Sequence, residues 1–184
     1  MDYKVKIYIQ QRSSTHIYDY DEVGNLIKDK SEQIAEIKWT VTGKVSDVIR
    51  TAGSQKPDLH FAYDAMGQRI AKTVTNKNTT DGTDKFVTTY YVRDPQGNVL
   101  AVYEHKHGDS GNGIFTLAEQ HLYGAGRLGM RKRDLALNAT NTSESTPPVT
   151  HYELTNHLGN VMAVISDEAS TTDEPTVVSL SDYY

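Results

Sequence analysis

The sequence predicts an all-β protein built from stacked antiparallel β-hairpins. Short stretches alternate apolar and polar residues, which is the pattern of a strand with one solvent-facing side. A turn motif that ends in glycine recurs along the chain, which is typical of a repeat protein. No stretch keeps helical periodicity over three turns, and the nearest candidate, 31–38, is too short. The 12 tyrosines, with abundant Val, Ile and Thr, also suit a pleated, half-buried surface.

The expected strands follow one another with short interruptions. They cover residues 3–9, 16–20, 25–28, 37–41, 45–50, 59–63, 70–74, 86–92, 99–104, 114–123 and 176–180, with two further arms on either side of Gly159. The run 99–104 is almost continuously apolar, which predicts burial on both faces. Polar loops are expected at about 76–84, 105–113, 138–148 and 167–175. We therefore expect residues 1–184 to form one array of repeats, with no independent second domain.

The recurring turn is the feature that organises the chain. In the copy at 20–24, Asp21 can accept hydrogen bonds from backbone N–H groups that follow it. Gly24 tolerates a positive φ without steric cost, and Tyr20 supplies a ring that can cover the base of the hairpin. A degenerate copy is expected near Gly126 or Gly129. The residues assigned to these turns, all in structural roles, are Tyr20, Asp21, Gly24, Trp39, Gly43, Tyr63, Asp64, Gly67, Asp94, Gly97, Asn156 and Gly159.

Composition excludes several classes of function. Without cysteine the chain has no disulfide, no thiolate metal site and no cysteine nucleophile. A formal net charge of −5 does not favour a nucleic-acid surface, and the one basic cluster, 131–133, is expected to be a solvated turn. No apolar run approaches the roughly 20 residues of a membrane helix, and this segment shows no signal-peptide layout. We predict no cofactor and no enzymatic activity.

Four other patterns in the sequence bear on chemistry. The sequence 108–111 (G-D-S-G) echoes a protease nucleophile motif, but no partner motif accompanies it, so a turn is expected. His105 and His107 would share one side of a strand and can chelate a metal, yet a solvated loop is favoured. The loop 76–84 fails the spacing of a calcium loop. Core packing is favoured over a ligand platform for the recurring aromatic residues, which are Tyr18, Tyr20, Trp39, Phe61, Tyr63, Tyr90 and Tyr91.

The repeated motif resembles the unit of the RHS family, also called YD-repeat proteins. Residues 18–25 (Y-D-Y-D-E-V-G-N) match the Tyr-Asp hairpin closely, and 61–68 match with Phe in place of the first Tyr. Residues 37–45 are similar with Trp and Thr replacing Tyr and Asp. Residues 156–161 (N-H-L-G-N-V) resemble the signature that opens the core region of the family, with Asn for Asp. The closing 182–184 resembles the segment that follows in relatives.

This resemblance implies a segment of a spiralling β-sheet shell in a bacterial, secreted or cell-surface protein. The implied function is structural and non-enzymatic: the wall encloses or presents a C-terminal toxin or effector polypeptide. The implied partners are the remaining RHS repeats and that effector domain, with self-association possible through open sheet edges. Asp94-Pro95-Gln96-Gly97 has letters similar to the family's autoproteolytic site but precedes the core signature, so we interpret it as a repeat turn. The alternative is an adhesion module that recognises glycans or proteins through exposed aromatic residues. We expect the chain to be a piece of a longer protein.

Overall fold

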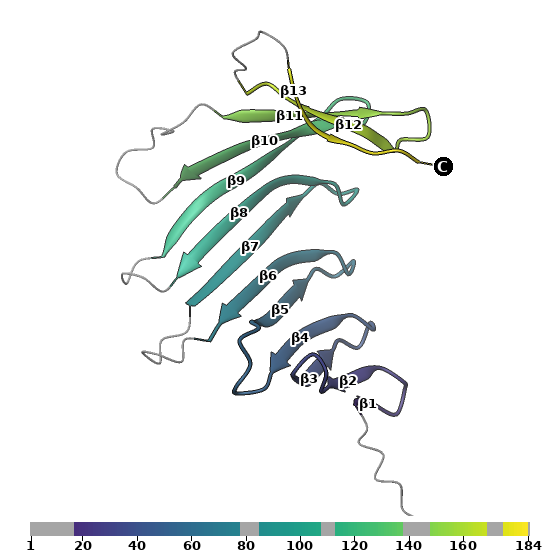
Figure 1. Ribbon diagram of the computed structural model, residues 1–184, viewed down its shortest axis with the longest axis vertical. Coiled ribbons are helices and arrows are strands. Elements are labelled where there is room, and N and C mark those ends of the chain that lie inside the picture. Colours follow the sequence, from purple (N-terminus) through teal and green to yellow (C-terminus); the bar gives the residue numbers. More distant parts are fainter. Residues whose placement is uncertain (1–16, 78–84, 108–112, 138–147, 169–174, 184) are drawn as a thin grey trace, which may run out of the picture.

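The prediction of an all-β fold of stacked hairpins is confirmed. The structure is a computed structural model that describes residues 17–77, 85–107, 113–137, 148–168 and 175–183. These residues form one 13-stranded antiparallel sheet whose strand order follows the chain order, so each strand pairs with its neighbours in sequence. Figure 1 shows the strands side by side in one twisted sheet, which we call the wall, with β11–β13 lying at an angle across one end. The described part of the chain contains no helix.

The strand bounds agree with most of the expected stretches. In order they are β1 (Tyr18–Tyr20), β2 (Leu26–Asp29), β3 (Ile34–Trp39), β4 (Val45–Arg50), β5 (Asp58–Tyr63), β6 (Arg69–Asn76), β7 (Lys85–Arg93), β8 (Val99–His107), β9 (Ile114–Tyr123), β10 (Arg127–Ala136), β11 (Val149–Thr155), β12 (Val161–Ser166) and β13 (Thr176–Leu180). The expected strand at 3–9 lies outside the described residues.

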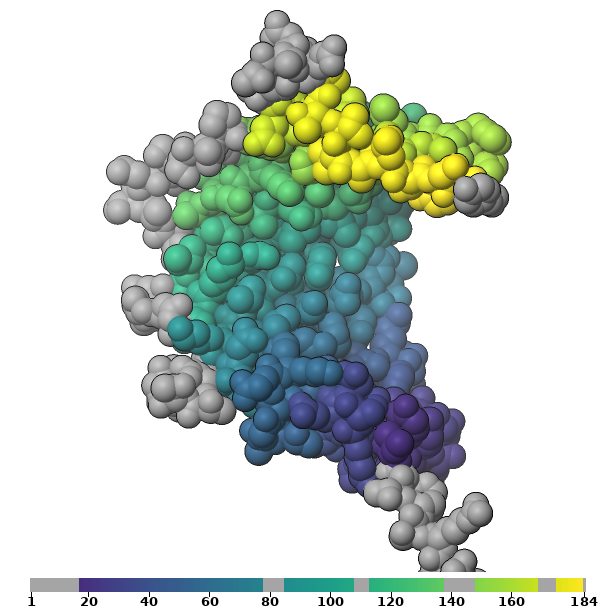
Figure 2. Space-filling model, viewed as in Figure 1, coloured from purple at the N-terminus to yellow at the C-terminus, as the bar shows by residue number. Residues whose placement is uncertain are grey.

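The sheet is a single layer, so it has almost no hydrophobic core. Among the described residues only Ile37 and Val102 are buried apolar side chains, at 7% and 8% exposure. Figure 2 shows the wall as one continuous surface in chain order. The prediction that 99–104 is buried on both faces is wrong, because Leu100 is 40% exposed. Alternation of burial is weak in a sheet that no second layer covers, which explains why an apolar run does not mark a buried strand here.

Cross-strand side-chain pairs take over part of the role of a core. Tyr103 on β8 and Phe115 on β9 stack with ring centroids 5.7 Å apart. The guanidinium of Arg69 lies 5.6 Å from the ring of Phe61 and 5.3 Å from that of Tyr91, which joins β5, β6 and β7. Phe61 and Tyr91 of the recurring aromatic set therefore act as cross-strand partners, which is the unit of stabilisation in a sheet. The expected core packing is wrong for Tyr18, Tyr20 and Tyr90, which are 48%, 60% and 40% exposed because no second layer covers the sheet.

Two segments expected to be loops or turns are strands. β8 continues through His107, so the loop expected at 105–113 begins only after that residue. The basic cluster 131–133 was expected to be a solvated turn, but it lies within β10, with Arg131 opposite Gln120 and Thr150. Because both faces of a single-layer sheet reach solvent, charged residues are tolerated inside a strand, and charge does not signal a turn. The remaining parts of the expected loops 76–84, 138–148 and 167–175 lie largely outside the described residues.

Gly129 allows β10 and β11 to approach each other. It has a φ of +150°, and a Cβ built on it would lie 2.0 Å from the carbonyl oxygen of His151. The pairing at this point is short, covering Gly129–Lys132 opposite 149–152. A side chain at position 129 would therefore clash with the His151 backbone, which can move only if the hydrogen bonds between β10 and β11 break.

We predict that Gly129→Ala lowers the free energy of unfolding by about 2–3 kcal/mol, because the new methyl group must displace the His151 carbonyl. Gly126→Ala is the matched control, since a Cβ there meets nothing within 4 Å, and we expect it to stay within about 0.5 kcal/mol. Urea unfolding followed by circular dichroism measures both. Equal effects of the two substitutions would contradict the close approach at Gly129.

Candidate functional site

The turns that join the hairpins form the most regular site in the protein. In the first, the N–H of Asp21 donates to the carbonyl of Asn25 at 2.9 Å, and the N–H of Gly24 donates to the carbonyl of Asp21 at 3.1 Å. The Asp21 Oδ1 accepts from the N–H groups of Val23 and Asn25 at 3.0 and 2.8 Å. Gly24 has a φ of +91°, a conformation that favours glycine. The side chain and the glycine together close the turn.

The same geometry recurs at four more of the predicted turns. In each, the backbone N–H of the residue at the Asp position donates to the carbonyl of the residue four positions later, and the glycine has a positive φ. The pairs are Thr40 with Lys44 (2.7 Å), Asp64 with Gln68 (2.9 Å), Asp94 with Asn98 (3.0 Å) and Asn156 with Asn160 (2.9 Å). The glycines are Gly43 (+74°), Gly67 (+76°), Gly97 (+94°) and Gly159 (+82°).

The replacements of Asp in the turns keep its hydrogen-bonding role. Asn156 Oδ1 accepts from the N–H of Leu158 at 2.9 Å and of Asn160 at 3.0 Å. Thr40 Oγ1 accepts from the N–H of Lys44 at 3.1 Å. An oxygen acceptor on a short side chain is thus the property that the turn requires, and a carboxylate is one way to provide it.

In four hairpins, the residue directly before the turn binds the preceding hairpin. The indole Nε1 of Trp39 donates to the carbonyl of Leu26 at 2.9 Å, and the hydroxyl of Tyr63 donates to the carbonyl of Val45 at 2.9 Å. In both cases the acceptor is the second residue after the turn glycine of the hairpin before. The sequence suggested that these rings cover the base of their own hairpin, and the bond to the neighbouring hairpin was missed.

Two further hairpins make the equivalent bond, one through an arginine and one through a tyrosine that precedes the degenerate turn. Arg93 Nε donates to the carbonyl of Arg69 at 3.2 Å, and the Tyr123 hydroxyl donates to the carbonyl of Val99 at 3.0 Å. Arg93 and Tyr123 were not among the predicted turn residues. Their position immediately before a turn was the signal that could have identified them. Arg93 was missed because an arginine replaces the aromatic residue, and Tyr123 was missed because the turn that follows it lacks the Asp.

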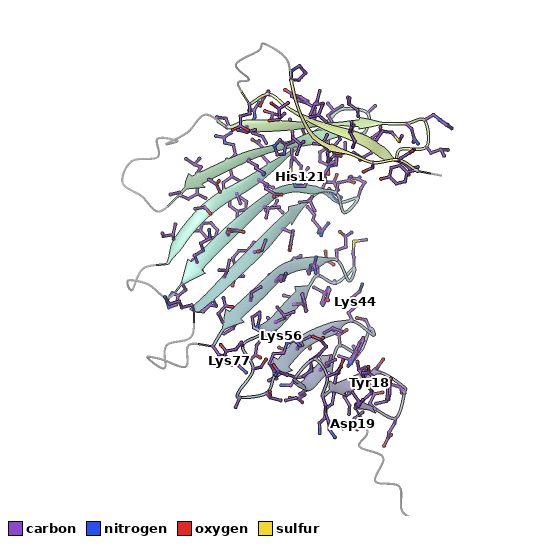
Figure 3. The ribbon with its side chains drawn as sticks, in the orientation of Figure 1. Tyr18, Asp19, Lys44, Lys56, Lys77 and His121 are labelled. Atoms are coloured by element: carbon purple, nitrogen blue, oxygen red, sulfur yellow. The ribbon has the colours of Figure 1, made fainter. Side chains whose placement is uncertain are left out.

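Side chains from one turn also lie against the glycine of the next. A Cβ at Gly67 would lie 2.9 Å from Cε of Lys44, and a Cβ at Gly97 would lie 2.3 Å from Nε2 of Gln68. Lys44 and Gln68 each follow the turn glycine of their own hairpin. Figure 3 labels Lys44 at the end of its hairpin, facing the next one along the wall. The turns at 40–44, 64–68 and 94–98 therefore stack on one another, and we call the series of turns from Asp21 to Asn98 the rim.

The two ends of the series differ from this rule. Tyr20 lies in β1, which is an edge strand, and is 60% exposed. The expected degenerate copy is the tight turn in which the N–H of Gly124 donates to the carbonyl of Gly126 at 2.8 Å. Gly129 lies beyond this turn, inside β10.

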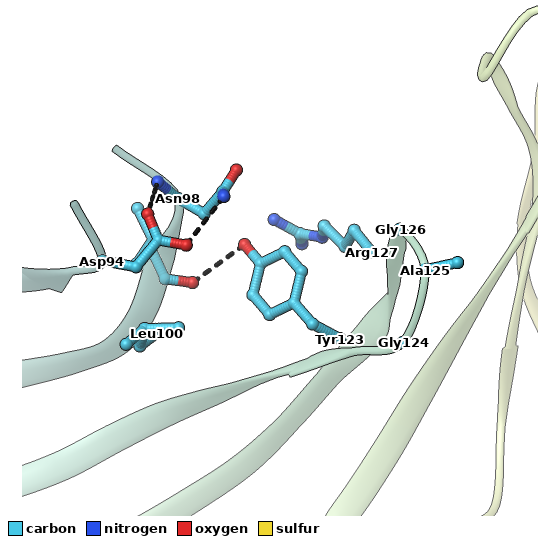
Figure 4. A pocket seen from close by; sticks show the side chains of 9 residues that line it. Asp94, Asn98, Leu100, Tyr123, Gly124, Ala125, Gly126 and Arg127 are labelled. Carbon is cyan, nitrogen blue, oxygen red and sulfur yellow. Dashed lines mark hydrogen bonds between the residues drawn. The ribbon is translucent and has the colours of Figure 1, made fainter. Parts of the chain in front are cut away.

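An open hollow of about 580 Å³ lies where the degenerate turn follows the regular ones. Asp94 and Asn98 line one side, and Tyr123 and Arg127 line the other (Figure 4). The Asp94 carboxylate already accepts from the Asn98 side chain at 2.8 Å, and Arg127 pairs with Glu153 at 2.7 Å. Asp94 is therefore engaged within its turn, and Arg127 is engaged in pairing β10 with β11; the lining residues include no serine, threonine, cysteine or lysine.

Electrostatics favour the ionised form of two turn aspartates. The side-chain hydrogen bond from Asn25 lowers the pKa of Asp21 below its ordinary value of 3.8. The side-chain hydrogen bond from Asn98 lowers the pKa of Asp94 in the same way. Donation to a carboxylate stabilises its charged form, so the turn is strongest when the Asp is ionised.

The other candidate chemistry is less organised. His107 stacks on Phe86 with centroids 4.7 Å apart, and His105 packs edge-on against Phe115 at 6.0 Å. The described part of the chain gathers no group of three His, Cys, Asp or Glu side chains that could hold a metal ion. The motif at 108–111 and most of the calcium-like loop 76–84 lie outside the described residues. In the described segments no helix is long and apolar enough to span a membrane.

About half of the chain resembles a small part of a much longer known protein. No family model matches the chain. The chain is similar to salivary gland surface protein 1 of Aedes aegypti, with 36% identity over 89 residues. The match covers 48% of this chain and 2% of the mosquito protein, so the chain spans only a small fraction of the length of that relative.

We expect Tyr63→Phe to lower the free energy of unfolding by about 1 kcal/mol, because it removes the bond to the part-buried Val45 carbonyl and leaves the ring in place. Tyr90→Phe removes a hydroxyl from a 40% exposed side chain and should change stability by less than about 0.5 kcal/mol. Urea unfolding is the measurement. If Tyr63→Phe is as neutral as Tyr90→Phe, the bond between hairpins does not stabilise the wall.

Acid should weaken the rim. Because the pKa values of Asp21 and Asp94 are lowered in the folded state, their contribution is complete above the unfolded value of 3.8 and is lost as the pH falls through the folded values. The urea concentration at the unfolding midpoint should therefore decrease when the pH is lowered below about 4. In the Asp94→Asn variant this position cannot titrate, so the decrease of the urea midpoint in acid should be smaller than in the wild type. Asp182→Asn, which lies outside the turns, should leave that decrease unchanged. An unchanged acid response in Asp94→Asn would contradict the assignment.

Proposed function

We propose that this chain is a structural, non-enzymatic wall segment of an RHS-type β-shell that encloses or presents a polypeptide, such as a toxin or effector domain. The observation that carries the proposal is the construction of the sheet: hairpins follow one another in chain order, and four of them are bound to the previous one by the residue before the turn. A wall requires continuous strand pairing, a turn at each rim and loops that tolerate insertion. It requires no catalytic group.

The thin core supports the same function. A domain that stands alone buries a hydrophobic face against a second layer, whereas the described residues here place only Ile37 and Val102 in buried apolar positions. One layer can serve as the boundary between an interior and the solvent. The residues lining such an interior would then be covered by the enclosed polypeptide, which is the partner that we propose, together with further repeats of the same kind.

The edges of the sheet define where further repeats would join. β1 and β13 are the outer strands of the sheet, and every residue of β13 is exposed. An open strand presents unpaired N–H and C=O groups that can pair with another strand. We propose that neighbouring repeats occupy these edges in a secreted or cell-surface protein, and that isolated chains associate through them.

Exposed tyrosines favour a second candidate, an adhesion module that binds glycans or a surface protein. Tyr20, Tyr90 and Tyr152 are 60%, 40% and 40% exposed. A ring with an accessible face can stack on a sugar. A glycan array probed with the purified chain tests this, with Tyr152→Ala as the variant and Tyr152→Phe as its control. A signal that Ala abolishes and Phe retains would support adhesion, whereas no signal would argue against it.

Charges placed on the open edge should reduce association. We expect the double variant Val178→Lys and Leu180→Lys to shift the chain from oligomers toward monomers, because lysine blocks edge-to-edge pairing. Leu128→Lys is the control, since this residue is 52% exposed but lies in the interior strand β10. Size-exclusion chromatography with light scattering gives the mass. A wild-type chain that is monomeric with a sharp thermal melt would contradict association through the edges.

Protease digestion of the native gene product tests the enclosing role. We expect an intact mass larger than that of this segment, and a downstream polypeptide that resists protease until the wall is weakened. Gly129→Ala should weaken the wall, and Gly126→Ala should serve as the matched control. A native product that ends at Tyr184, or a downstream polypeptide that is cut equally fast in both variants and the wild type, would overturn the proposal.

A further inference from the structure

We propose that the hollow beside the degenerate turn binds a lysine side chain that a partner polypeptide presents. The hollow measures about 580 Å³, and Asp94, Asn98 and Leu100 line it on one side while Tyr123 and Gly126 line it on the other (Figure 4). This volume lies within the range of sites that hold small ligands. The class of ligand is indicated by the earlier turns, where a long side chain of the protein itself occupies the corresponding place.

Two earlier turns show what occupies this place. Lys44, the first residue after its turn glycine, lies against Gly67 of the next turn, since a Cβ built there would be 2.9 Å from the Lys44 Cε. The Lys44 ammonium also lies 5.6 Å from the ring centroid of Tyr63, which precedes that next turn. Gln68 covers Gly97 in the same way, because a Cβ built there would overlap its Nε2. A long side chain therefore reaches forward from one turn to the next.

At the hollow the corresponding side chain is too short to reach forward. Asn98 holds the position of Lys44, directly after the turn glycine, but its Nδ2 donates back to Asp94 Oδ2 at 2.8 Å. Asn25 makes the same backward bond to Asp21 Oδ2 in the first turn, at 2.9 Å. An asparagine at this position thus closes its own turn and leaves the next turn uncovered.

The turn that follows is also shorter, which widens the hollow. Because β9 ends at Tyr123 and β10 begins at Arg127, three residues, 124–126, join them, whereas five residues, 94–98, join β7 and β8. A Cβ built on Gly126 meets nothing within 4 Å. The hollow therefore has room for a side chain of the length that Lys44 contributes to the earlier turn.

Tyr123 offers a ring in the position where Tyr63 carries the Lys44 ammonium. Both tyrosines directly precede a turn, and both donate their hydroxyl to the carbonyl of the second residue after the previous turn glycine. Tyr123 is 36% exposed, and in the described part of the chain no lysine or arginine lies over its ring. An aromatic face attracts a cation that approaches within about 6 Å of the ring centroid. The ring thus supplies one half of a site for an ammonium group.

Asp94 supplies the countercharge. Its Oδ1 accepts from the N–H of Asn98 and its Oδ2 from the Asn98 side chain, each at 2.8 Å. Each carboxylate oxygen has two lone pairs, so Oδ2 can accept an ammonium N–H as well. The side-chain hydrogen bond from Asn98 lowers the pKa of Asp94, which keeps this group ionised at neutral pH. Glu153 pairs with Arg127 at 2.7 Å, so the charged groups at the hollow sum to a negative charge that favours a cation.

These groups select a primary ammonium on a flexible apolar stem, which is the lysine side chain. Donation to Asp94 requires N–H groups, which a trimethylated ammonium lacks. Leu100, which lines the hollow and is 40% exposed, offers apolar surface for the methylene groups of the stem. The site is separate from the enclosing role, because a lysine can bind here whether or not the sheet surrounds a polypeptide.

The test is saturation-transfer NMR of the 184-residue chain with a blocked glycine–lysine–glycine peptide. We expect transfer to be strongest at the lysine ε-methylene group. The same peptide with norleucine, which keeps the stem and removes the charge, should bind at least about fivefold more weakly. The peptide with trimethyl-lysine should also bind more weakly, because it cannot donate a hydrogen bond to Asp94.

Variants locate the site. Asn98→Lys should fill the hollow from within, as Lys44 does at the earlier turn, and should weaken binding of the lysine peptide at least about fivefold. Asn25→Lys is the matched control, since it adds the same charge at the same position of the first turn and should bind as the wild type does. Asp94→Asn keeps an oxygen acceptor in the turn but removes the charge, and it should also weaken binding at least about fivefold.

Three results would overturn the proposal. They are the absence of transfer to the lysine peptide at millimolar concentration, wild-type binding by both Asn98→Lys and Asp94→Asn, and an equal loss of binding in Asn25→Lys. Tighter binding of the trimethyl-lysine peptide would contradict the hydrogen bond to Asp94. Circular dichroism shows whether each variant is folded, and if Asn98→Lys does not fold, Asp94→Asn decides.

Discussion

The bond between the residue that precedes each turn and the hairpin before it is the interaction on which this architecture depends. In four hairpins this residue donates to the carbonyl of the second residue after the previous turn glycine. The donors are Trp39, Tyr63, Arg93 and Tyr123. A one-residue slip of a strand turns all its side chains to the other face, and burial usually prevents it. Here little is buried, so a side-chain bond at a fixed offset from the turn sets the register.

This construction makes the protein close to one-dimensional. Each hairpin contacts only its sequence neighbours, so stability is approximately a sum of terms for single hairpins and for the interfaces between them. Such a wall can be lengthened by adding repeats without redesigning a core. It also leaves unpaired edges wherever it stops, which links the fold to the proposed role as part of a longer shell.

Much of the fold could be predicted from the sequence because its signals are local. The Asp, Asn or Thr at the first turn position and the glycine at the fourth impose their geometry within a few residues, and Asp21 to Gly24 illustrates this. The strand β10 was not predicted, because Arg127–Ala136 is rich in charged residues. It is a strand because it pairs with β9 on one side and β11 on the other, which the local sequence does not reveal. Leu100 shows the converse, since an apolar run without a covering layer stays exposed.

The site was less accessible to sequence reasoning than the fold. The bonds between hairpins join residues such as Tyr63 and Val45, whose relation depends on how neighbouring hairpins stack. The role of Arg93 is obscured further, because an arginine replaces the aromatic residue while keeping the donor.

Hydrogen–deuterium exchange of the purified chain, read strand by strand, tests the account most directly. Nearest-neighbour stabilisation predicts that protection is greatest in the central strands β6–β9 and falls stepwise toward β1 and β13. It further predicts that removing the Tyr63 hydroxyl lowers protection mainly in the strands that flank it. Uniform protection across all thirteen strands, lost everywhere at once in the Tyr63→Phe variant, would mean that the chain unfolds as one cooperative unit and would contradict the account.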